Sequence, residues 1–206
     1  MALTFEKARA AFKSRGGTLR TRDILALGIH RRTLYAMRDA GELIQLARGL
    51  FRLAELPPLS EPDLATVAMR IPQGVVCLIS ALAYHEMTTQ IPHEVHLALP
   101  RTARDPKLTH PPLSIFRFSS KAFEAGIETH IIDEIPVRVY GPEKTLADCF
   151  KYRNKIGLDV ALEALRFCCG TSPTGGRRRS RLQAVLEHAR VCRVERVMRP
   201  YLDATL

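Results

Sequence analysis

Three arginines and a tyrosine lie close together in the chain, at Arg31, Arg32, Tyr35 and Arg38. A guanidinium group donates hydrogen bonds in a fork that fits guanine edges and phosphate groups, and a tyrosine can stack or donate to a phosphate. On a helix with about 100° per residue these side chains fall within an arc of roughly 120°. The pattern therefore predicts one helix face that binds nucleic acid.

The opposite side of this helix is apolar and small enough to pack closely on a neighbouring helix. It gathers Ile29, Thr33, Ala36, Met37 and Ala40, with Leu34 at its edge. The pattern predicts a helix from His30 to Ala40 that stops at Gly41. A solvated basic face on an ordinary helical bundle is the alternative explanation of the same charges.

The residues on both sides of this helix predict the elements that would position it. Thr21 to Leu27 predicts a short preceding helix, with Thr21 as its cap and a permissive Gly28 to turn the chain. After Gly41, Leu43–Leu46 and Leu50–Leu53 predict two short strands joined by a glycine-containing hairpin. Arg48 would lie at the tip of this hairpin, within reach of a groove or a phosphate. This order is that of a helix-turn-helix followed by a wing.

The net charge of +10 is distributed unevenly along the 206 residues. Residues 1–56 carry 11 Lys and Arg against 5 Asp and Glu, residues 57–169 are close to neutral, and residues 170–206 carry 8 against 3. Positive charge that is concentrated at the two ends of the chain indicates a specialised polyanion-binding region more than a uniformly basic surface.

We expect two domains of an α+β protein, residues 1–56 and 57–206, because two prolines stiffen the stretch 55–60. A preceding helix is expected over Thr4–Arg15. In the second domain, Val75–Met87 is almost wholly apolar and predicts a buried core helix. Strands are expected at Leu113–Phe118, Ile127–Ile132 and Ile135–Tyr140, further helices follow, and the chain ends in one or two helices. A mixed α/β second domain ending in helices is the expected architecture.

Three segments together resemble a known family: the N-terminal module, Gly74–Pro100 (GVVCLISALAYHEMTTQIPHEVHLALP) and Tyr140–Arg166 (YGPEKTLADCFKYRNKIGLDVALEALR). They are similar to the antitoxin of the bacterial AbiE type toxin–antitoxin system, an abortive infection system. The resemblance covers roughly residues 3 to 170. It implies an N-terminal winged helix-turn-helix that represses its own operon, and a C-terminal domain that counters a nucleotidyltransferase-like toxin.

The same resemblance implies which residues contact DNA. Besides the helix face, it adds phosphate contacts from the preceding helix and from the wing. The implied contact residues are Thr21, Arg22, His30, Arg31, Arg32, Tyr35, Arg38 and Arg48. His30 stands where a capping serine is common in the family. The implied partners are double-stranded operator DNA with inverted repeats and the cognate toxin.

Other candidate chemistry is weak. His85, His93 and His96 lack the spacing of a zinc site, so we expect no metal. Lys144 and Asp148, at i and i+4, predict a surface ion pair. No nucleophile, base and orienting group assemble, so we expect no catalytic residue, no cofactor and no enzymatic activity.

The arginine run near the C-terminus has three open interpretations. Arg177, Arg178, Arg179 and Arg181 could contact phosphates, meet an acidic surface on the toxin or form a solvated loop. For the second domain, sensing of a small ligand and covalent modification of the toxin also stay open.

The remaining expectations concern where the chain works. No apolar run approaches the ~20 residues that span a bilayer, and the N-terminus lacks the apolar core of a signal peptide. We therefore expect a cytoplasmic protein that contacts no membrane, a monomer or weak dimer in solution. Its five cysteines should be buried thiols rather than disulfides.

Overall fold

A computed structural model describes the backbone of residues 2–170 and 175–204, and the side chains of residues 4–168 and 181–204. The chain divides into two compact units. The first comprises Met1–Pro72 with Ile131–Val137, and the second comprises Gln73–His130 with Arg138–Leu206. Each contains helices and strands, so the chain is a mixed α+β protein. The domain boundary predicted after Leu56 stays a prediction.

The first unit begins with three helices and a three-stranded antiparallel sheet of order β1-β3-β2. Its elements are α1 (Ala2–Lys13), β1 (Thr18–Arg20), α2 (Thr21–Ala26), α3 (Arg31–Asp39), β2 (Leu43–Ala47), β3 (Leu50–Leu53) and α4 (Pro62–Arg70). We call α1 to β3 the N-terminal module. The two helices and two strands predicted between Thr21 and Leu53 are confirmed to within two residues at their ends.

Strand β1 was not predicted, because three residues are too short to show an alternating pattern. It pairs with β3 so that Thr18 faces Arg52. Its presence also corrects the predicted cap of α2: Arg20 occupies the capping position, and its side chain makes no capping hydrogen bond. Thr21 is instead the first residue of the helix.

The core of the N-terminal module contains side chains from all three helices and from the sheet. These are Ala8, Phe12, Leu19, Ile24, Leu34, Met37, Leu43, Phe51 and Leu53. Arg52 is also buried, and its guanidinium donates to Thr18 Oγ1 at 2.9 Å and to the Pro57 carbonyl at 3.0 Å. Arg52 therefore ties β1, β3 and the segment that follows β3 together.

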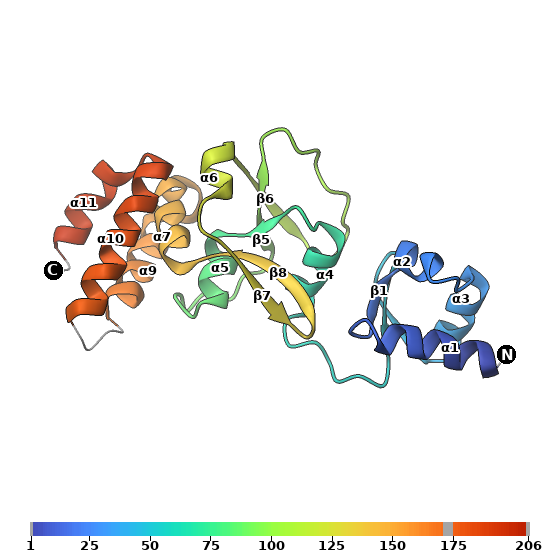
Figure 1. Cartoon of the computed structure of the whole chain (residues 1–206). Coiled ribbons are helices and arrows are strands. Elements are labelled where there is room, and N and C mark those ends of the chain that lie inside the picture. The colour runs from blue at the N-terminus through green and yellow to red at the C-terminus, as the bar shows by residue number, and fades with distance from the viewer. Residues whose placement is uncertain (1, 171–174, 205–206) are drawn as a thin grey trace. The chain divides into compact units, whose positions relative to one another are not determined.

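The second unit contains most of a five-stranded sheet of order β6-β5-β4-β8-β7, whose segment Ile131–Val137 is grouped with the first unit. Figure 1 shows β5, β6, β7 and β8 of this sheet. The strands are β4 (Val75–Val76), β5 (Val95–Pro100), β6 (Leu113–Phe118), β7 (Ile127–Ile132) and β8 (Ile135–Tyr140). The pairs β5–β6 and β4–β8 are parallel, whereas β4–β5 is antiparallel. The ranges predicted for β6, β7 and β8 are confirmed.

The helices of the second unit gather mainly after the last strand. They are α5 (Leu78–Tyr84), α6 (Ser120–Glu124), α7 (Pro142–Lys151), α8 (Arg153–Ile156), α9 (Leu158–Gly170), α10 (Gly175–Cys192) and α11 (Glu195–Asp203). Figure 1 shows α7, α9, α10 and α11 together as one helical group. The expectation of terminal helices is confirmed. None of the helices within residues 2–170 and 175–204 has the length and apolar content that crossing a membrane requires.

The single core helix predicted over Val75–Met87 is wrong. Val75 and Val76 form β4 in the middle of the sheet, and the chain turns at Leu78, which has a φ of +48° and is the first residue of the short helix α5. The side chains of a central strand and of a buried helix are both largely shielded from water, so both elements appear in the sequence as continuous apolar runs. Periodicity alone cannot separate them.

Candidate nucleic-acid interface

Helix α3 buries one face and exposes the other. Leu34 and Met37 are fully buried, while Arg31, Arg32 and Tyr35 are exposed. Leu34 therefore lies at the centre of the buried face rather than at its edge. Gly28 lies between α2 and α3, and its φ of +79° allows the chain to turn there. Helix α3 then begins after His30, whose backbone is extended.

The three arginines of α3 differ in what holds them in place. The guanidinium groups of Arg31 and Arg32 have no hydrogen bond or ion pair with any side chain within residues 4–168 and 181–204. Arg38 donates from Nε and Nη2 to Asp39 Oδ1, at 2.9 and 2.7 Å. Its Cζ also lies 5.0 Å from the centroid of the Tyr35 ring. His30 is exposed, and its side chain does not cap the helix.

The β2–β3 hairpin places Arg48 in its turn, where the side chain is exposed. Gly49 follows with a φ of +76°, a backbone conformation that favours glycine. The Gly49 carbonyl accepts a hydrogen bond of 2.9 Å from the Thr21 backbone N–H. The structure thus brings the start of α2 against the hairpin turn, and with it two of the residues implied as phosphate contacts.

Arg22 is exposed at the start of α2, but its charge is partly balanced locally. Asp23 accepts from Arg22 Nε at 3.3 Å and from Arg20 Nε at 3.2 Å. Asp23 therefore orients two arginines beside the N-terminus of α2. Arg20 was not singled out from the sequence, because only the unexpected strand β1 places it beside Asp23.

The C-terminal arginine run is described only in part. The side chains of Arg177, Arg178 and Arg179 lie outside the described residues. Arg181 donates to the Cys168 carbonyl at 3.2 Å and lies 3.5 Å from Glu143 Oε1. This arginine holds α10 against α7 and α9.

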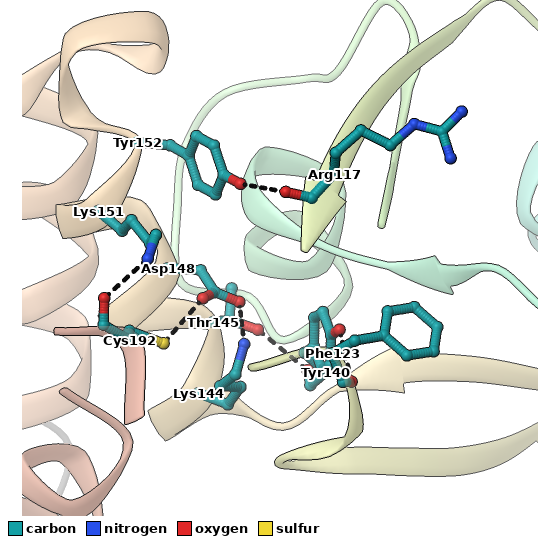
Figure 2. A network of polar contacts seen from close by, with 9 residues as sticks. All are labelled: Arg117, Phe123, Tyr140, Lys144, Thr145, Asp148, Lys151, Tyr152 and Cys192. Carbon is teal, nitrogen blue, oxygen red and sulfur yellow. Dashed lines mark hydrogen bonds and ion pairs between the residues drawn. The ribbon is translucent and has the colours of Figure 1, made fainter. Parts of the chain in front are cut away.

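The second unit contains a buried polar network that links α7 to α10 (Figure 2). Lys144 Nζ lies 2.5 Å from Asp148 Oδ2, and both side chains are fully buried. The Cys192 thiol donates to Asp148 Oδ1 at 3.1 Å. Rings of Tyr140 and Phe118 lie 4.0 and 4.9 Å from Lys144 Nζ, so aromatic faces surround the cation.

The surface ion pair predicted at these two positions is therefore wrong. An i,i+4 pair of opposite charge usually marks a solvated helix face, but α7 has no such face at this point. Lys144 to Phe150 are buried without a break. The available signal was the apolar and small character of the intervening residues, which is typical of a helix enclosed on all sides.

Burial shifts the ionisation of this network. It raises the pKa of the Asp148 carboxyl, and the nearby Lys144 ammonium partly opposes the shift. Burial also raises the pKa of the Cys192 thiol to about 12, with a further contribution from the Asp148 charge. The thiol is thus a donor and not a nucleophile at neutral pH.

Further hydrogen bonds join the network to the sheet and to the end of α10. Tyr140 donates its hydroxyl to the Phe123 carbonyl at 2.7 Å, and Tyr152 donates to the Arg117 carbonyl at 3.1 Å (Figure 2). Lys151 Nζ donates to the Cys192 carbonyl at 2.8 Å. Satisfied polar groups of this kind fix how α7, α10 and the sheet pack.

A hollow of about 230 Å³ lies beside the start of α7 in the second unit. Its lining is His85, Glu86, Met87, Pro142, Phe167, Cys168 and Arg181. Small-molecule sites usually enclose roughly 300–1,000 Å³. Within the part of the chain whose side chains are described, no group of three His, Cys, Asp or Glu residues is placed to hold a metal ion.

Three comparisons relate the chain to known proteins. Residues 6–54 match the family model described as "Transcriptional regulator, AbiEi antitoxin". The solved structure of the RV2827C protein from Mycobacterium tuberculosis aligns over 98% of this chain and 81% of that one, with a TM-score of 0.59 and 15% sequence identity. That likeness shows a shared fold. No curated protein matches the chain.

Proposed function

We propose, from the match of residues 6–54 to the AbiEi antitoxin regulators, that this chain is a DNA-binding transcriptional autorepressor and antitoxin. The N-terminal module is a winged helix-turn-helix in this proposal, with α3 as its recognition helix and β2–β3 as its wing. The observation that carries it is the exposed face of α3, where Arg31 and Arg32 have no partner among the described side chains.

We assign the remaining phosphate contacts to the wing turn and to the start of α2. Arg48 in the wing turn and Thr21 at the start of α2 are linked through the Gly49 carbonyl, so they can follow one phosphate backbone. Arg22 is exposed beside them. The operator would contain inverted repeats, each bound by α3 in the major groove.

The DNA half is tested by an electrophoretic mobility shift with the DNA upstream of the protein's own gene. We expect a specific complex that resists competition by unrelated DNA. Its binding constant should fall steeply with salt, by roughly 0.9 log unit per log unit of salt for each phosphate neutralised. Equal and weak binding of both DNAs would reject the repressor assignment.

The antitoxin half rests on the word antitoxin in the description of the matched family, and on the resemblance of Gly74–Pro100 and Tyr140–Arg166 to the AbiE antitoxins. It assigns the second unit to countering a nucleotidyltransferase-like toxin. We expect residues 57–206, produced alone, to keep at least part of the protection against the cognate toxin expressed from a separate promoter. Circular dichroism must show that the fragment is folded. A folded fragment that gives no protection would instead attribute protection to repression by the N-terminal module.

A further inference from the structure

Arg38 differs from the other two arginines of α3. Two of its donors already bind Asp39, and its guanidinium stacks on Tyr35, whereas Arg31 and Arg32 are unpaired among the described side chains. An exposed ion pair between an arginine and a carboxylate usually contributes little to the stability of a protein. Here two neighbours of different kinds hold the same group, so its orientation is the property to explain.

The support beneath Arg38 reaches the core of the N-terminal module. The ring of Phe51, on β3, is 1% exposed and therefore fixed. Tyr35 packs against it edge-to-face, with centroids 6.4 Å apart and planes at 76°. Tyr35 still has 43% of its surface exposed and carries the Arg38 guanidinium over its ring. The packing of Phe51 in the core therefore supports Tyr35, and Tyr35 in turn supports the exposed guanidinium of Arg38.

The hydrogen-bond geometry leaves one end of this guanidinium available. Arginine has five N–H donors, on Nε, Nη1 and Nη2. Asp39 Oδ1 takes the Nε–H and one Nη2–H. Both Nη1–H groups and the second Nη2–H stay available, and these form the fork that fits guanine O6 and N7.

We propose that Arg38 contacts a guanine in the operator, and that Asp39 and Tyr35 are positioning residues that hold its fork before DNA binds. This inference rests on the proposed DNA-binding function and names the base that α3 would select. Arg31 and Arg32, which no described side chain holds in place, adapt to phosphates or to neighbouring bases.

The charge of Asp39 distinguishes this role from a plain contribution to affinity. A carboxylate on a DNA-facing helix repels phosphates, so it weakens binding to every sequence. It raises the preference for guanine, because an oriented fork cannot adapt to the edges of the other bases. Removing the carboxylate should therefore strengthen non-specific binding and relax specificity together.

The test selects binding sites for the full chain from duplexes with a randomised central region. The wild-type protein should enrich sites with a guanine preference of about 5- to 150-fold at one position of each repeat. Arg38→Ala should lose the preference at that position alone. Asp39→Asn should reduce it at least about threefold while its binding to random-sequence duplex tightens, because less charge opposes the phosphates. Tyr35→Phe, which keeps the ring, should retain it.

Glu55→Gln is the matched control, because it removes one negative charge from an exposed carboxylate that pairs with Lys13 on α1 instead of with a residue of α3. It should leave every base preference unchanged. The inference is overturned if Asp39→Asn keeps the wild-type preference, or if Arg38→Ala weakens all sequences equally. Enrichment of no sequence by the wild-type protein would overturn the proposed function itself, an outcome that is distinct from either of these.

Discussion

Replacing Arg31 and Arg32 together with alanine is expected to weaken binding to the operator at least about 30-fold while leaving the protein folded. Each arginine that contacts a base contributes ~1–3 kcal/mol. Loss of both therefore weakens binding by about 2 kcal/mol or more, which is about 30-fold or more in Kd. Neither side chain has a hydrogen bond or ion pair with a described side chain, so their removal breaks no such interaction there.

The double substitution Lys7→Ala with Arg15→Ala gives the appropriate control. It removes the same charge from exposed positions of the same module that lie outside α3. Mobility shifts on operator and unrelated DNA, with circular dichroism of each variant, separate lost contacts from lost folding. Operator binding by the α3 double variant at wild-type affinity would mean that α3 is not the recognition helix.

The second large effect is expected in the buried network of the second unit. Lys144→Met keeps an unbranched side chain that is one heavy atom shorter, and it leaves the Asp148 carboxyl buried without its cation. Breaking a buried pair in this way typically destabilises a protein by about 3–5 kcal/mol. Unfolding in urea, followed by circular dichroism, should show this loss, whereas Lys121→Met on the exposed surface of α6 should change stability by no more than about 0.5 kcal/mol.

Two further measurements identify the cause of that loss. Adding Asp148→Leu to Lys144→Met should recover stability, because an apolar pair of similar volume is often neutral or better in a core. The loss in the single variant should also shrink as the pH is lowered. Lys144 opposes the rise that burial causes in the pKa of Asp148, so its removal raises that pKa further above the unfolded value. The folded variant therefore takes up the proton at a higher pH than the wild type does, and it regains stability as the pH falls. Wild-type stability of Lys144→Met at neutral pH would contradict the importance of the pair.

The N-terminal module could be predicted well because its signals are local. Gly28, Gly41 and Gly49 all have positive φ, and the amphipathic pattern between the first two specifies α3. Glycines and helix periodicity act over a few residues, and so they can be recognised in a single sequence. What could not be predicted was β1, which exists only because β3 lies beside it.

The second unit was harder to predict because its defining contacts join distant residues. Val75 and Val76 become a strand only through β5 and β8, which lie far along the chain. Lys144 and Asp148 lie inside only because α10 covers α7 and brings Cys192 to Asp148. No local pattern encodes a partner 44 residues away. The same reasoning explains why the orientation of Arg38, which depends on Phe51, was not foreseen.

The hydrogen bond from Cys192 to Asp148 has a consequence for how the gene product matures. A chain folds domain by domain as it is synthesised, with N-terminal parts first. Every element of the N-terminal module precedes residue 54, whereas α7 obtains the thiol and the carbonyl of Cys192 only after that residue has been synthesised. A stop codon after α7 but before α10 would thus spare the N-terminal module and deprive α7 of its covering helix. Under the proposed function, such an allele would keep the operator occupied while the second unit is incomplete.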